Sequence, residues 1–109
     1  MRRVNEAMRE VLSAHLKELK DPRIGFVTVT AVETSPDLRY AHVYVSVLGS
    51  GDEREQTLSG LAASAGFLQG RVGHELRMKR TPTLDFRYDE SIDRGMRIEE
   101  LLHEAEDER

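Results

Sequence analysis

The part of the sequence best suited to chemistry is a set of glycines with cations among and behind them. Gly66, Gly70 and Gly73 are spaced by four and then three residues, so on a helix they share one face. A face without side chains lets another backbone approach, and the adjacent basic side chains can contact phosphates. The basic residues concerned are Arg71, Arg77, Lys79 and Arg80. The pattern favours a surface for a phosphate backbone; the alternative is close packing of the glycine face against another helix or the sheet.

The residues needed for a catalytic or metal centre do not occur at useful spacings. The four histidines are far apart, so no pair has the i, i+4 spacing of a helical metal site, and no serine lies in a nucleophile elbow. His15 falls on the apolar stripe of a predicted helix, where we expect it to pack rather than act as a base. We therefore predict no enzymatic activity, no metal and no cofactor. A small hydrolase using His42 or His74 is a rival interpretation that lacks partner residues at motif spacing.

An aromatic pattern on a predicted strand offers a second route to nucleic-acid binding. Tyr40, His42 and Tyr44 alternate with apolar residues and so share one strand face. Such side chains can stack on unpaired bases. A hairpin that is covered on one side gives the same alternation without any ligand, so both interpretations stay open.

Length, cysteine content and charge distribution indicate the kind of domain that carries these residues. The chain has 109 residues, no cysteine and a formal net charge of −4, which indicates one domain without disulfides. The charge is uneven: residues 1–23 carry +2 and residues 66–88 carry +3, whereas residues 24–65 carry −3 and residues 89–109 carry −6. We find no secretion signal or membrane span, and we expect a cytoplasmic monomer with no membrane partner.

A long helical pattern positions the glycines and cations. It runs from Glu53 to Lys79, and its apolar stripe consists of Leu58, Leu61, Ala65, Leu68, Val72 and Leu76. One unbroken helix of that length would span about 39 Å at 1.5 Å per residue, which is too long for a domain of this size. We therefore predict two helices joined by a kink at Ser64-Ala65-Gly66.

The remaining elements complete an α+β domain. We predict a first helix that carries Lys17 and Lys20 in its last turn, then an antiparallel hairpin, a third strand after the kinked pair, and a last helix. The hairpin strands are residues 24–34 and 38–48, the third strand is residues 84–88, and the last helix carries the stripe 98–105. The order α-β-β-α-kink-α-β plus a C-terminal helix, with a three-stranded sheet, is that of a type II KH-like domain. Residues 1–90 would form the RNA-binding part, and residues 91–109 a helix and acidic tail of the same domain.

These elements and motifs resemble a known family over nearly the whole chain. The resemblance rests on residues 21–30 (DPRIGFVTVT), residues 41–46 (AHVYVS), the spacing Pro82-x-Leu84-x-Phe86-x-x-Asp89, and residues 95–98 (GMRI). In this order they are similar to ribosome-binding factor A, a family of bacterial small-subunit assembly factors. The resemblance implies a KH-like fold in which an Ala-x-Gly kink replaces the usual Gly-x-x-Gly loop. Here the triplet is Ser64-Ala65-Gly66, so its first position departs from the family.

The resemblance also implies a function. It suggests binding to 16S rRNA and to free, immature 30S ribosomal subunits, support for late 30S maturation including 16S rRNA 5′-end processing, growth in the cold, and release by a ribosome-associated GTPase. The candidate RNA-binding residues are Arg3, Arg9, Ser64, Gly66, Gly70, Arg71, Gly73, Arg77, Lys79 and Arg80. The alternative is a KH-like protein-interaction module without direct RNA binding, with the acidic tail or the hairpin face as its surface.

Overall fold

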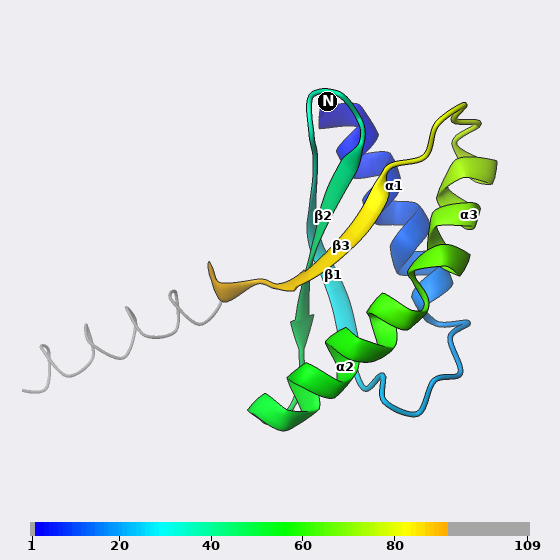
Figure 1. Ribbon diagram of the computed structural model, residues 1–109. Helices are drawn as coiled ribbons and strands as arrows, with labels where there is room; N and C mark the ends of the chain where they lie inside the picture. Colours follow the sequence, from blue (N-terminus) through cyan, green and yellow to red (C-terminus); the bar gives the residue numbers. More distant parts are fainter. Residues whose placement is uncertain (1, 92–109) are drawn as a thin grey trace, which may run out of the picture.

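The computed structural model describes residues 2–91, and in Figure 1 its three helices lie against one side of a three-stranded sheet. The elements are α1 (Arg2–Leu16), β1 (Val27–Thr34), β2 (Tyr40–Val47), α2 (Gly51–Ala63), α3 (Ala65–Glu75) and β3 (Thr83–Tyr88). This is the predicted order, so the α+β, KH-like fold is confirmed. The predicted last helix and the acidic tail lie outside the described residues from position 92 onward.

The sheet has β2 at its centre. β1 pairs with β2 in an antiparallel manner across the short turn, and β2 pairs with β3 in parallel, beginning with Tyr40 opposite Thr83. The parallel pair is possible because α2 and α3 form the crossover between its strands. The predicted alternation on β2 is confirmed, since its four apolar residues are buried: Ala41, Val43, Val45 and Val47.

A bulge in β1 shifts that strand's alternation. The pairing register changes between Val29 and Ala31, so the buried residues of β1 are Val29 and Val32 rather than every second residue. Thr30, the extra residue, donates a hydrogen bond from its hydroxyl to Asp89 at 2.6 Å. Hydrogen bonds from Ser91 and then from Thr30 lower the pKa of Asp89. Through its bond with Thr30, Asp89 joins β1 to the segment that follows β3.

The core lies between the sheet and the three helices. Each helix contributes fully buried side chains, and they pack against the apolar face of the central strand. The helical members with no exposed surface are Met8, Leu12, Leu61, Leu68 and Val72. Burial of a large apolar side chain stabilises a fold by about 1.5–3 kcal/mol, so this layer supplies most of the driving force. No helix in residues 2–91 is long and apolar enough to cross a membrane.

The segment between α1 and β1 differs from the prediction. α1 ends at Leu16, and the next turns are closed by short-range bonds from Glu18 N to His15 O and from Leu19 N to Leu16 O. Such three-residue turns tighten the end of a helix, so Lys17 and Lys20 lie beyond its last turn. Both hairpin strands are also shorter than predicted, at residues 27–34 and 40–47.

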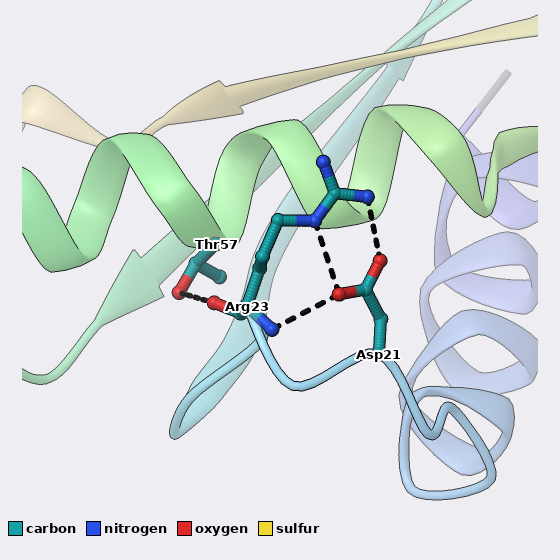
Figure 2. A network of polar contacts seen from close by, with 3 residues as sticks. All are labelled: Asp21, Arg23 and Thr57. Atoms are coloured by element: carbon teal, nitrogen blue, oxygen red, sulfur yellow. Dashed lines mark hydrogen bonds and ion pairs between the residues drawn. The ribbon is translucent and has the colours of Figure 1, made fainter.

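This segment is attached to α2 by a small polar network, shown in Figure 2. Asp21 accepts hydrogen bonds from the guanidinium of Arg23 and from the backbone N–H of the same residue, and these bonds lower the pKa of Asp21 to about 2. Thr57 of α2 is 1% exposed, and its hydroxyl donates to the Arg23 carbonyl at 3.3 Å. The same oxygen accepts from the Gly25 N–H at 3.2 Å. The turn is therefore fixed by both its own side chains and a buried threonine.

Candidate nucleic-acid interface

The predicted kink is confirmed at Ser64. α2 ends at Ala63 and α3 begins at Ala65, with Ser64 between them at φ −93° and ψ 0°. The backbone N–H of Ser64 bonds to the carbonyls of Gly60 and Leu61, whereas its side chain forms no capping bond to α3. The chain thus bends through backbone geometry, and the apolar stripe stays on the sheet side of both helices.

The three glycines of α3 have different surroundings. A Cβ built on Gly66 or on Gly70 would meet nothing within 4 Å, so both positions are open to solvent. A Cβ on Gly73 would collide with the side-chain oxygen of Thr81. Close packing, the alternative interpretation of the glycine face, therefore holds at Gly73, while Gly66 and Gly70 leave bare backbone that a ligand can approach.

An aromatic side chain beside these glycines was missed from the sequence. Phe67 is 44% exposed, and the guanidinium of Arg71 lies 5.2 Å from its ring centroid. Phe67 lies outside the apolar stripe of the helix. An aromatic residue away from that stripe is the feature of the sequence that could have indicated its exposure. The open part of α3 thus presents a flat aromatic ring and a cation next to exposed backbone.

The cations after α3 lie on a loop rather than on the helix. The prediction that helical structure reaches Lys79 is wrong, because α3 ends at Glu75. The bonds from Met78 N to Gly73 O and from Arg77 N to His74 O form a Schellman motif. Its left-handed position is held by Arg77, at φ 51°, where glycine is the usual residue.

Some of the predicted cations lie at one end of the molecule, whereas Arg9 pairs with Glu6 and Arg71 lies within reach of Glu18, beyond the opposite end of α1. Arg3, Val4 and Ala7 of α1 line a small pocket together with Leu76 and Met78, which follow α3. Arg80 lines a neighbouring pocket with residues of the β1–β2 turn, and Figure 1 shows the start of α1 beside that turn. We call this end the basic end and define it by Arg2, Arg3, Arg39, Arg77, Lys79 and Arg80.

The cations of this surface also differ in how far their charge is compensated. Among residues 2–91, no ion pair involves five members of the basic end: Arg2, Arg3, Arg77, Lys79 and Arg80. Arg39 is the sixth and contacts Asp37 at 3.6 Å. Arg9, a predicted RNA-binding residue, instead pairs with Glu6 at 2.9 Å. Most of the basic end thus offers uncompensated charge, whereas Arg9 is partly neutralised.

The open face of the sheet is only partly available for stacking. His42 contacts Asp85 at 3.0 Å, and Arg87 contacts the same carboxylate at 2.8 Å. Partial burial acts to raise the pKa of Asp85, but hydrogen bonds from Arg87 and His42 outweigh it and leave the pKa lowered. Tyr44 is half-buried, whereas Tyr40 is 55% exposed. Of the predicted aromatic group, Tyr40 is therefore the most exposed residue, and no ion pair within residues 2–91 involves it.

Comparison with known proteins places this geometry in a family. Residues 1–102 match the family Ribosome-binding factor A. The crystal structure of ribosome-binding factor A from Thermus thermophilus is similar to this chain with a TM-score of 0.71 and 28% identity, over 79% of this chain and 92% of that one. The solution NMR structure of a putative ribosome binding factor A from Thermotoga maritima is similar with a TM-score of 0.70 and 38% identity, over 75% and 79%.

This chain belongs to the ribosome-binding factor A family. The resemblance seen in the sequence is thereby confirmed. A homology model of the Thermus thermophilus member, fitted into a cryo-EM map of a 30S–RbfA complex, is similar with a TM-score of 0.67 and 28% identity, over 79% of this chain and 91% of that one.

Two of the family-like motifs have structural roles here. The Asp-Pro-Arg segment at residues 21–23 forms the turn that Thr57 holds against α2. Asp89 joins the β1 bulge to the end of β3. Neither feature belongs to the basic end, so in this chain both motifs stabilise the fold. Among residues 2–91, no three His, Asp or Glu side chains form a group that could hold a metal ion.

Proposed function

We propose that this protein is a non-catalytic RNA-binding factor that associates with 16S rRNA on the immature 30S ribosomal subunit. The membership in the ribosome-binding factor A family supports the proposal, and so does the relative that was fitted into a 30S complex. The observation that carries it is the basic end, where cations from three separate segments gather and, apart from Arg39, form no ion pair with any of residues 2–91.

The proposed mechanism is binding that holds one conformation of the RNA. Phosphates are neutralised by the basic end, while the bare backbone at Gly66 and Gly70 admits the RNA close to α3. Phe67 lies between the two glycines, and Arg71 follows them on the side of the basic end. The interface therefore extends from the kink to the loop after α3, over about 20 Å if each helical residue adds 1.5 Å.

The family suggests the biological setting of this binding. We propose that the protein acts as a cytoplasmic monomer, supports late 30S maturation including 5′-end processing of 16S rRNA, contributes to growth in the cold, and is released by a ribosome-associated GTPase. It would use no cofactor. In this role the protein consumes no substrate, which agrees with the lack of a nucleophile and base at motif spacing in its sequence.

The test is a salt series of binding to purified immature 30S subunits. Removing Arg77 and Lys79 together should weaken binding and reduce the slope of log affinity against log salt by roughly one to two units, because each cation neutralises about one phosphate. The matched control removes Lys17 and Lys20, which also form no ion pair within residues 2–91 but follow the opposite end of α1.

The control double variant should retain the affinity and slope of the unmodified protein. Equal losses from both double variants would place the RNA surface elsewhere. Unchanged binding in both would favour the alternative, a KH-like module that contacts a protein of the subunit.

A further inference from the structure

A pocket at the edge of the basic end is suited to a single nucleotide. It has a volume of about 330 Å³ and is lined by Arg39, Tyr40, Arg80, Thr81 and Thr83. The first two residues come from the β1–β2 turn and the start of β2, the next two from the segment that leads into β3, and Thr83 is the first residue of β3. We call it the turn pocket. It combines two arginines, one exposed tyrosine and two threonines.

The walls of the turn pocket are held in place without a ligand. The N–H of Thr83 donates to the carbonyl of Arg39 at 2.8 Å, which joins the two segments directly. The carbonyl of Thr81 accepts from the side-chain amide of Gln69 at 3.2 Å, and Pro82 between the two threonines is fully buried. A pocket with fixed walls loses little conformational entropy when it binds, which favours a specific ligand.

Two residues with unfavourable backbone angles lie near the turn pocket in the sequence. Within residues 2–91, the non-glycine residues with positive φ are Leu38, at 59°, and Arg77, at 51°. Leu38 directly precedes Arg39, and Arg77 precedes Arg80 by three residues. Left-handed backbone is unfavourable for such side chains and is concentrated at functional sites in proteins. Leu38 is therefore adjacent to the wall of the turn pocket, whereas Arg77 follows the end of α3 and precedes the second wall.

We propose that the turn pocket holds one unpaired nucleotide of RNA, with its base stacked on Tyr40 and a neighbouring phosphate between Arg39 and Arg80. The proposal rests on the RNA-binding function proposed above and adds what kind of RNA is recognised. Tyr40 is 55% exposed and can receive a base on its ring, which requires a nucleotide that is not stacked in a duplex. The hydroxyl of Thr83 can donate to or accept from the edge of that base, whereas the hydroxyl of Thr81 packs against Gly73 of α3.

The first test measures binding of three variants to immature 30S subunits over a salt series. Tyr40→Ala should weaken binding roughly tenfold with an unchanged salt slope, because stacking releases no counterions. Tyr40→Phe should bind like the unmodified protein, since it keeps the ring. Arg80→Ala should weaken binding and reduce the slope by about one unit. Full binding by Tyr40→Ala would overturn the pocket while leaving the wider function intact.

The second test identifies what touches the pocket in the complex. The photo-crosslinking residue p-benzoylphenylalanine replaces Tyr40, and in a control protein it replaces Phe26, which is 82% exposed near the opposite end of the hairpin. A crosslink from position 40 to an unpaired 16S rRNA nucleotide, not formed from position 26, is the expected result. A crosslink from position 40 to a ribosomal protein or to paired RNA would overturn the proposal. Failure of the unmodified protein to bind the subunit would overturn both this proposal and the wider function.

Discussion

Two glycines of the kinked helix pair, ten residues apart, have opposite surroundings. A Cβ on Gly60 of α2 would lie 2.6 Å from the side chain of Ile24, whereas a Cβ on Gly70 of α3 would meet nothing within 4 Å. Gly60 belongs to what we call the packed region, in which the segment of residues 21–25 lies against α2. Gly70 belongs to the open region, which consists of the exposed surface of α3 and the loop up to Arg80.

The difference shows that one residue type lies in two opposite environments of the same structural unit. In the packed region, glycine makes room for a neighbouring segment, so its replacement should affect folding. In the open region, glycine costs helix stability and gives no packing in return, as expected if the proposed RNA approaches this surface. Stability and RNA binding should therefore respond to different substitutions, and the following experiments test that separation in order of decreasing effect.

The largest effect is expected from Thr57→Val in the packed region. Loss of the hydroxyl leaves the Gly25 N–H and the Arg23 carbonyl without this partner in a part-buried place. Unsatisfied groups of this kind cost about 1–3 kcal/mol each, so we expect the free energy of unfolding to fall by about 2 kcal/mol. Urea denaturation measures the change. Thr57→Ser, which keeps the hydroxyl and lacks the methyl group, should lose clearly less, and an equal loss would show that the hydroxyl is not the main contribution of this residue.

The next experiment compares alanine at the two glycines. Gly60→Ala should destabilise the protein by about 1–2 kcal/mol, because the strain of overpacking exceeds the gain in helix propensity. Gly70→Ala should stabilise it by roughly 0.5–1 kcal/mol and weaken binding to immature 30S subunits, because the new methyl group keeps the RNA backbone away. Thermal unfolding and subunit binding are measured on both proteins.

The control for this comparison combines Gly60→Ala with Ile24→Ala. The double variant removes the colliding side chain, so the two substitutions should be strongly non-additive in stability. Additive losses would show that Ile24 is not the obstacle. Unchanged subunit binding by Gly70→Ala would exclude close approach of the RNA backbone at that position.

Arg77→Gly tests the open region with a smaller change. Glycine is the preferred residue at this left-handed position, so the free energy of unfolding should rise by about 0.5–1 kcal/mol. Binding to the subunit should nevertheless weaken, because one uncompensated cation is lost. Arg77→Lys is the matched control and should keep both the strain and the affinity. A protein that became less stable and bound normally would contradict the separation of folding from binding.

The sequence was sufficient to predict the parts of the fold that depend on periodicity. The alternation on β2 and the helical stripe through Leu61 and Leu68 both predicted the observed burial. The same pattern could not show where α3 ends, because Arg77 adopts a conformation that is uncommon for its residue type. Nor could it distinguish Gly70 from Gly73, since the difference depends on Thr81, which is brought close only by the fold.

The candidate site was predictable in its residue types and less so in its assembly. The basic residues of the first helix and of the segment after the glycines were identified, but Arg39 and Phe67 were not. Arg39 joins the basic end because β2 pairs in parallel with β3, a long-range pairing that local spacing does not reveal. Arg9 was included by its charge, although a nearby Glu6 compensates it, and that i, i+3 spacing was visible in the sequence.

The smallest effect on stability is expected from His15 of α1, which contacts α3 of the open region. His15 is 12% exposed in its side chain, and its ring nitrogens contact Glu18 at 3.0 Å and Glu75 of α3 at 2.6 Å. Both ring nitrogens can donate to carboxylates only in the imidazolium form. The hydrogen bonds with Glu18 and then with Glu75 therefore raise the pKa of His15 above its ordinary value of 6.5.

The raised pKa predicts a pH dependence of stability with a definite sign. A raised pKa in the folded state means that the contact contributes fully below the unfolded value of 6.5 and is lost as the pH rises through the higher folded value. The unmodified protein should therefore lose more stability than His15→Gln between about pH 6 and pH 8, measured by urea denaturation. The effect should be small, because Glu75 is 42% exposed and solvent screens the pair.

Subunit binding at constant pH should be unchanged in His15→Gln, since the histidine joins two helices and does not belong to the basic end. Parallel stability curves for the two proteins would show that the contact does not hold α3 against α1, and the position of the open region would then depend on apolar packing alone.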